Sequence, residues 1–199
     1  MRRVAFAMMT VLLCANLGAV LGACQMRDPY VAAPAMATSG NWKIERQVDR
    51  VTGLPMPSAT NIINNASNTF AERPSEASLQ LTCFDGKPLV RFAFAFKVGT
   101  DANSIIGYRF DEKPGHDNVA ARFLQEYRTV VIEDRAAINT FVNELATSAT
   151  LVVRLRSLNA GRTIADFKLD GAPAAIEAAF AGCPLTPPQP EKKKRGAKA

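Results

Sequence analysis

The fold is decided by the stretch Ser78–Phe96, which reads SLQLTCFDGKPLVRFAFAF. On both sides of its centre, apolar residues recur at every second position, which is the period of a β-strand with one buried face. The centre is Asp85-Gly86, a dipeptide favoured in two-residue hairpin turns because both turn positions need a positive φ. The stretch therefore predicts a β-hairpin with one core-facing side: Leu79, Leu81, Cys83, Val90, Phe92, Phe94 and Phe96. An aromatic platform for a ligand is the alternative interpretation of the phenylalanines.

Alternating apolar residues extend this β pattern along the chain. They predict further strands at 41–48, 104–112, 126–134, 150–158 and 162–170, of which the last two form a hairpin. The segments 50–68 and 112–118 are rich in glycine, proline and asparagine, so we expect a loop and a turn there.

Two helices complete the expected fold. The acidic pair Glu133-Asp134 suits a helix N-terminus, and an apolar stripe follows it at i, i+3, i+4 and i+7: Ile138, Phe141, Val142 and Leu145. Pro173 suits the first turn of a second helix, which ends near Phe180. The predicted fold class is α+β, mainly an antiparallel β sheet or sandwich with two short helices packed on it.

The N-terminus has the features of a secretory signal. Arg2-Arg3 precedes Val4–Ala23, a run without charged residues. A membrane-spanning helix is the competing interpretation of such a run. Gly18 and Gly22 weaken a helix, and no basic cluster follows the run, so we favour the signal.

The end of this run resembles the lipobox of bacterial lipoproteins, since Leu21-Gly22-Ala23-Cys24 is a leucine, two small residues and a cysteine. The resemblance implies a signal peptide over 1–23 and attachment of a fatty-acyl glyceride to the thiol of Cys24. Gln25, rather than an aspartate, follows the cysteine, which implies the outer membrane and a periplasm-facing domain. The membrane is then a partner through the lipid anchor, which holds stably once two or more acyl chains insert.

Two cysteines remain for the folded part. Cys14 would leave with the signal and Cys24 would carry lipid, which leaves Cys83 and Cys183. An even pair in an oxidising compartment predicts a disulfide, and two buried free thiols are the alternative. We expect neither a metal site nor a cofactor, because two cysteines and one distant histidine do not form a ligand cluster.

The positive charge of the chain lies at its ends. Of 24 basic residues, seven lie in the signal or in the C-terminal tail 184–199, and the body between them carries 17 residues of each sign. A neutral body argues against nucleic-acid binding. The proline-rich, then basic tail is expected to be disordered. Its basic run either stays solvated or attaches to an anionic envelope polymer, membrane surface or acidic partner: Lys192, Lys193, Lys194 and Arg195.

These features divide the chain into four parts. Residues 24–40, rich in alanine, proline, serine and threonine, are expected to be a flexible tether. Residues 41–183 then form a single globular domain, between the signal peptide and the tail.

No catalytic motif stands out, and we do not expect an enzyme. The only histidine, His116, is placed in a turn and is expected to be exposed. The acidic pairs Asp111/Glu112 and Glu133/Asp134 are expected at strand or helix edges. Adjacent residues on a strand point to opposite faces, which is poor geometry for acid–base work. Four arginines either line an anion-binding face or belong to a solvated sheet face with cross-strand pairs: Arg91, Arg109, Arg154 and Arg156.

Several short sequence motifs occur in an order that resembles that of the accessory proteins of bacterial type VI secretion known as TagO or VasI. The landmarks run from Trp42 and Asp49 through LQLTCFDGKPLV and IIGYRFDE to FKLDGAPAAIEAAFAGC, which ends at Cys183. The resemblance implies a non-catalytic role in assembling a secretion machine, with an envelope protein or a cell-wall component as partner. The alternatives are a periplasmic inhibitor or a hydrolase acting on cell-wall metabolism.

Overall fold

The computed structural model describes residues 35–100, 103–183 and 185. The predicted signal peptide, the lipidation site Cys24 and the basic run of the tail lie outside the described residues. Within the described residues, no helix is long and apolar enough to cross a membrane.

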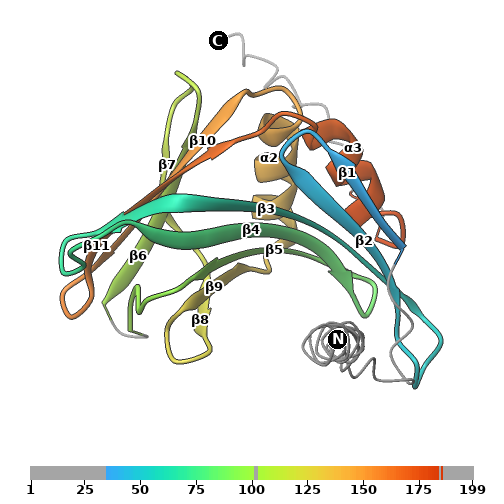
Figure 1. Cartoon of the computed structure of the whole chain (residues 1–199), viewed down its shortest axis with the longest axis horizontal. Coiled ribbons are helices and arrows are strands. Elements are labelled where there is room, and N and C mark those ends of the chain that lie inside the picture. The colour runs from blue at the N-terminus through green and yellow to red at the C-terminus, as the bar shows by residue number, and fades with distance from the viewer. Residues whose placement is uncertain (1–34, 101–102, 184, 186–199) are drawn as a thin grey trace, which may run out of the picture. The chain divides into compact units, whose positions relative to one another are not determined.

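The described part contains strands and two helices (Figure 1). The strands are β1 (Ala35–Ser39), β2 (Trp42–Val48), β3 (Pro55–Asn68), β4 (Ser75–Phe84), β5 (Lys87–Phe94), β6 (Ser104–Phe110), β7 (His116–Val119), β8 (Arg122–Leu124), β9 (Thr129–Ile132), β10 (Thr150–Ser157) and β11 (Gly161–Lys168). The helices are α2 (Arg135–Leu145) and α3 (Ala172–Ala179).

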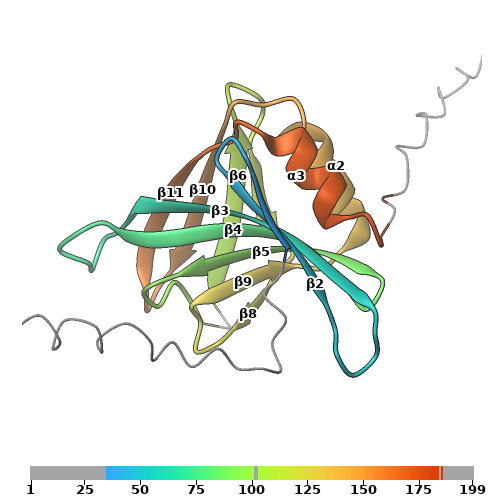
Figure 2. The ribbon, with the colours of Figure 1, turned by 45° about the vertical axis from the view of Figure 1, so that its right-hand side comes forward.

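All strands belong to one antiparallel sheet that curls around α2 (Figures 1 and 2). Its order is β7-β6-β10-β11-β3-β4-β5-β9-β8, and the β1–β2 hairpin is attached to β3 through β2. The edge strands β7 and β8 are neighbours in sequence, separated only by Ala120 and Ala121, so the chain itself links the two ends of the curled sheet. The predicted class, α+β with a mainly antiparallel sheet and two short helices, is confirmed, and the sheet is a single curved layer.

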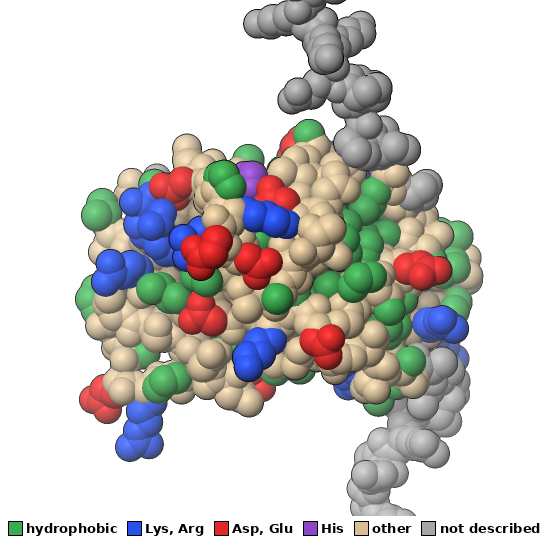
Figure 3. All heavy atoms as spheres, turned by 90° about the horizontal axis from the view of Figure 1, so that it is seen from above, with side chains coloured by type: hydrophobic (Ala, Val, Ile, Leu, Met, Phe, Trp, Pro, Cys, Tyr) green, Lys and Arg blue, Asp and Glu red, His purple; other side chains and the backbone are tan. Residues whose placement is uncertain are grey.

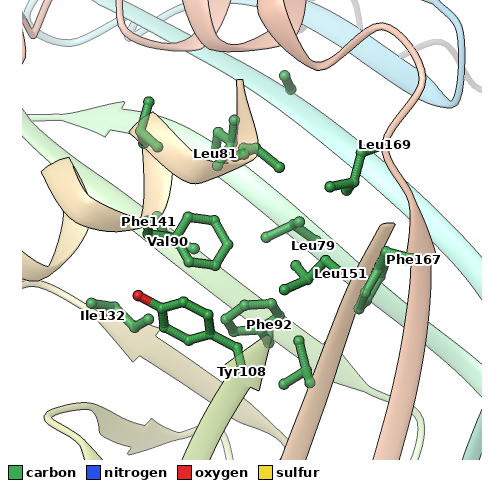
Figure 4. Close-up of a cluster of buried hydrophobic side chains, with 14 of the residues drawn as sticks. Leu79, Leu81, Val90, Phe92, Tyr108, Ile132, Phe141, Leu151, Phe167 and Leu169 are labelled. Atoms are coloured by element: carbon green, nitrogen blue, oxygen red, sulfur yellow. The ribbon is translucent and has the colours of Figure 1, made fainter. Parts of the chain in front are cut away.

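The core lies between the inner face of the sheet and α2. Phe141 of α2 contacts three aromatic rings from two strands, with centroid distances of 6.0 Å to Phe92, 5.0 Å to Tyr108 and 5.1 Å to Phe110. The side chains of Phe92, Tyr108 and Phe141 point toward one another in Figure 4, beside aliphatic residues of β4, β5, β9 and β10. The predicted stripe of α2 is buried, and the Asp134 side chain accepts a hydrogen bond from the Ala137 N–H at 2.8 Å. The hairpin at Asp85-Gly86 and the two helices are therefore confirmed.

A disulfide ties α3 to the sheet. Cys83 lies near the end of β4 and Cys183 follows α3, with their Cα atoms 5.7 Å apart. The predicted pairing of these two cysteines is thus present in the structure. The buried face of α3 consists of alanines, Ala172, Ala175 and Ala179, which let the helix lie close to β3.

Three sequence-based expectations were wrong in detail. The expected loop at 50–68 contains β3, a 14-residue strand. Its inward positions include the small Ala59 and Ala66 and the polar Asn61, and part of this face packs against α3. The apolar alternation that marks other strands is therefore weak in β3.

The expected tether does not extend to residue 40. Residues 35–39 form β1, which pairs with β2 along its length. The turn that follows packs against the start of α3, where the Asn41 N–H donates to the Asp170 carbonyl at 2.9 Å. A Cβ on Gly40 would collide with that carbonyl group, so this contact requires glycine. The third error, at 112–118, concerns β7 and is described below.

Candidate functional site

Basic side chains gather on the outer face of β6, β10 and β11. On β10, Leu151, Val153 and Leu155 point into the core, so Arg154 and Arg156 point outward. We name this surface the arginine face, and it consists of Arg109, Arg154, Arg156 and Arg162. Figure 3 shows basic side chains (blue) and acidic ones (red) close together over this part of the molecule, near the histidine (purple).

The register of the strands places like charges against one another. Arg156 lies directly opposite Arg162 in the β10–β11 pair, and Arg109 lies opposite Val152, next to Arg154 along β10. Like charges directly opposite each other destabilise an antiparallel pair. Such an arrangement favours a bound anion. Of the four arginines considered in the sequence, Arg91 lies elsewhere, on β5, where it donates to the Gln125 side chain at 3.0 Å.

One carboxylate partly neutralises the arginine face. Asp117 of β7 forms ion pairs with the guanidinium groups of Arg154 at 3.1 Å and Arg156 at 2.8 Å, and the latter is also a hydrogen bond. Gly107 of β6 provides the room, because a Cβ there would lie 2.9 Å from an Asp117 carboxylate oxygen and 2.8 Å from the His116 carbonyl oxygen. The absence of a side chain at 107 thus allows β7 to approach the sheet.

The Asp117 carboxylate is held in its ionised form. Partial burial opposes ionisation, but hydrogen bonds from Arg154 and the Asn118 N–H, with the charges of Arg156 and Arg154, outweigh that cost and lower the pKa from 3.8. Asp117 is therefore a fixed negative charge between two arginines at neutral pH.

The other side of β7 faces the core. Adjacent strand residues point to opposite faces, so His116 points inward where Asp117 points outward. The Nε2 atom of His116 lies 2.7 Å from Oε1 of Glu144 on α2, and its ring lies 4.7 Å from that of Tyr108. His116 is half-buried on a strand. The expectation of an exposed turn residue was wrong, because the turn lies at Asp111-Glu112 and β7 begins at His116.

Tyr108 is the most strongly perturbed titratable group of this region. It is 5% exposed, and burial, followed by the negative charge of Glu144, raises the pKa of its phenol to about 12. The phenol is thus neutral at physiological pH and contributes a buried dipole beside His116.

A hollow of about 420 Å³ lies beside β7. It is lined by Gly107, Tyr108, Arg109, Gly115, His116, Asp117, Val152, Arg154 and Ile164. The buried Nε atom of Arg154 has no hydrogen-bond acceptor among the described residues. Guanidinium groups bind carboxylates and phosphates through paired N–H donors, so this hollow and the arginine face suit a small anionic group.

The remaining candidates have structural partners. Asp111 accepts hydrogen bonds from Ala149 and Thr150 at the start of β10, Asp134 caps α2, and Glu133 pairs with Arg122 at 3.0 Å. In the described ranges, no group of three or more histidine, cysteine or acidic residues could hold a metal ion. Sequence reasoning did not identify Gly107, Glu144 or Arg162 as parts of the site, because only the pairing of β6, β7, β10 and α2 brings them together.

No known family model matches the sequence, and no curated protein matches it. Among solved structures, the crystal structure of invasion associated protein B from Bartonella henselae is similar, with a TM-score of 0.48 and 12% sequence identity. The similarity covers 73% of this chain and 96% of that one. It carries no inference about function.

Proposed function

We propose that this chain is a lipid-anchored envelope protein that binds an anionic partner through the arginine face, without catalysis. The observation that carries the proposal is the convergence of Arg154 and Arg156 on the single carboxylate of Asp117. Two further arginines of the same face, Arg109 and Arg162, have no acidic residue opposite them in the strand register. The face carries four arginines and two carboxylates, Asp117 and the exposed Asp166 of β11, so it retains an excess of positive charge.

The favoured partner is an acidic segment of an envelope protein, such as a component of a secretion machine. A carboxylate of the partner would reproduce the contacts that Asp117 makes within the chain. Charge complementarity of this kind mainly sets the association rate and the choice of partner. An anionic cell-wall polymer offers the same chemistry and is distinguished by the experiment below.

The disulfide supports a location of the folded domain outside the cytosol, because such bonds persist in oxidising compartments. Attachment through Cys24 to the outer membrane is the part of the proposal that the lipobox resemblance supports. Mass spectrometry of the detergent-extracted protein tests it, since the mature chain should begin with an acylated Cys24. A free thiol at that position would contradict the anchor.

Paired variants test the arginine face. Arg154→Gln/Arg156→Gln removes two charges but keeps hydrogen-bond donors for Asp117. Arg91→Gln/Arg128→Gln removes two charges from outside the arginine face and serves as the matched control. We expect binding of fluorescent poly-L-glutamate to weaken at least tenfold, about 1.4 kcal/mol, in the first variant only. Equal weakening in both would contradict a specific face.

Sedimentation with purified peptidoglycan sacculi separates the two partners. A protein that binds sacculi in preference to poly-L-glutamate, with the same dependence on Arg154 and Arg156, has a cell-wall polymer as its ligand. Binding to poly-L-glutamate alone favours an acidic protein segment.

A hydrolase is the second candidate, and the His116–Glu144 pair beside the hollow is the observation that favours it. A carboxylate that orients a histidine is a common arrangement for a general base. The test is wall hydrolysis by the purified protein and by His116→Ala. Activity that disappears in the variant would make the chain an enzyme.

A further inference from the structure

Exposed apolar side chains gather at the tips of two neighbouring hairpins. Val48, Val51 and Leu54 lie at the tip of the β2–β3 hairpin and are 58%, 94% and 52% exposed. Phe84, at the tip of the β4–β5 hairpin, is 55% exposed. We name these four residues the apolar tips. Large apolar side chains gathered on a surface mark a contact site rather than chance exposure.

The two tips form one surface. Leu54 and Phe84 line the same hollow of about 550 Å³, together with Met56 and the Asp85-Gly86 turn. Figures 1 and 2 show both hairpins projecting from the same end of the sheet. The opposite end carries the β3–β4 and β10–β11 turns, roughly 45 Å away along the 14 residues of β3.

The β2–β3 turn is held in its exposed position. The Asp49 carboxylate accepts hydrogen bonds from the Val51 N–H at 2.8 Å and the Thr52 hydroxyl at 2.7 Å. A backbone hydrogen bond from Asp49 to the Leu54 carbonyl closes the turn at 2.8 Å. These contacts satisfy the only acidic residue of the turn and present Val51 to the outside.

The chain enters the fold beside the apolar tips. Ala35, the first residue of β1, pairs with Arg46, only two residues from Val48. Ten residues lie between Cys24 and Ala35, so the two residues are at most roughly 40 Å apart even when the chain is fully extended. A lipid on Cys24 therefore keeps the bilayer within reach of the tips.

We propose that the apolar tips rest on the bilayer that holds the lipid anchor, an inference that depends on the lipidation of Cys24. Val51, Leu54 and Phe84 would enter the boundary between headgroups and acyl chains, as apolar side chains of interfacial proteins do. Exposed Arg46 and Lys87 flank the tips and suit anionic headgroups. Asp85, also at a tip, limits the contact to the interface.

Fluorescent labelling of the full-length lipoprotein tests this surface. With Cys24 acylated and Cys83 bonded to Cys183, the variant Val51→Cys offers one free thiol for an NBD dye. Leu158→Cys, in the β10–β11 turn, is the matched control because Leu158 is also apolar and 80% exposed. Both proteins are placed in vesicles of phosphatidylethanolamine and phosphatidylglycerol that contain nitroxide-bearing lipids.

We expect the nitroxide lipids to remove most of the emission at position 51 and none at position 158. Unquenched dye at both positions in protein that floats with the vesicles would overturn the membrane contact while leaving the anchor intact. Equal quenching at both would overturn the orientation. Iodide, a quencher dissolved in the buffer, reports whether the dye is exposed to solvent. A dye at position 51 that neither iodide nor the nitroxide lipids quench would show that a protein covers the apolar tips, and would overturn the assignment to lipid. Absence of acyl mass on Cys24 would overturn the anchor and this contact together.

Discussion

Reduction of the Cys83–Cys183 disulfide should remove a large share of the stability of the fold. The bond closes a loop with a sequence separation of 100 residues. In the chain-entropy model, a crosslink across about 100 residues stabilises the folded state by roughly 4.7 kcal/mol at 25 °C, because it restricts the unfolded chain. Domains of this size unfold with a total of roughly 5–15 kcal/mol. The reduced protein should therefore be only marginally stable.

Urea unfolding with and without dithiothreitol measures the difference. With a denaturant dependence of roughly 2 kcal/mol per molar, the midpoint should fall by roughly 2 M on reduction. The Cys83→Ala/Cys183→Ala variant should match the reduced protein and should be insensitive to dithiothreitol. A fall of less than about 0.5 M would refute the reasoning, since it would mean that the reduced, unfolded chain is already compact.

Two further predictions concern the environment of β7. The pKa of Tyr108 is raised from 10.0 to about 12, so the folded state holds the phenolic proton more tightly than the unfolded state does. Stability should be complete below pH 10 and should fall by about 3 kcal/mol as pH rises to 12, at 1.36 kcal/mol per pKa unit; chemical denaturation at several pH values should show this fall in wild type and a clearly smaller one in Tyr108→Phe. Gly107→Ala places a Cβ 2.9 Å from the Asp117 carboxylate and should destabilise by about 1–3 kcal/mol, with faster amide exchange in β7 measured by mass spectrometry; unchanged exchange there would contradict the close approach.

Local sequence patterns predicted the elements whose buried faces are filled by large apolar residues. The hairpin around Asp85-Gly86 and the apolar stripe of α2 belong to this group. The pairing of Cys83 with Cys183 was also predicted, but on other grounds: the two other cysteines were assigned to the signal peptide and to lipid, and the expected compartment is oxidising. β3 was missed because α3 packs on part of its inner face, where the strand carries small or polar residues such as Ala59 and Asn61. Strand prediction from alternating residues depends on large apolar side chains, and β3 has few of them on its inner face.

The candidate site was predictable only in part. The sequence grouped Arg91, Arg109, Arg154 and Arg156 as candidates for one anion-binding face, and the structure places Arg109, Arg154 and Arg156 together but Arg91 on β5. The contribution of Asp117 depends on β7, a short strand that follows Pro114-Gly115 and pairs irregularly with β6. The ion pairs of Asp117 with Arg154 and Arg156 join strands about 40 residues apart in sequence, and no local pattern indicates such contacts.

The pairing of β3 with β11 also constrains when the fold can be completed. Asn68 pairs with Thr163 and Ser67 with Ile164, so the middle of the sheet joins segments from the two halves of the chain. A chain that emerges N-terminus first, from a ribosome or a translocation channel, cannot close this sheet until the residues of β11 have appeared. The sheet therefore remains incomplete for most of the time that the chain is emerging, and an incompletely folded chain is what passage through a narrow channel requires.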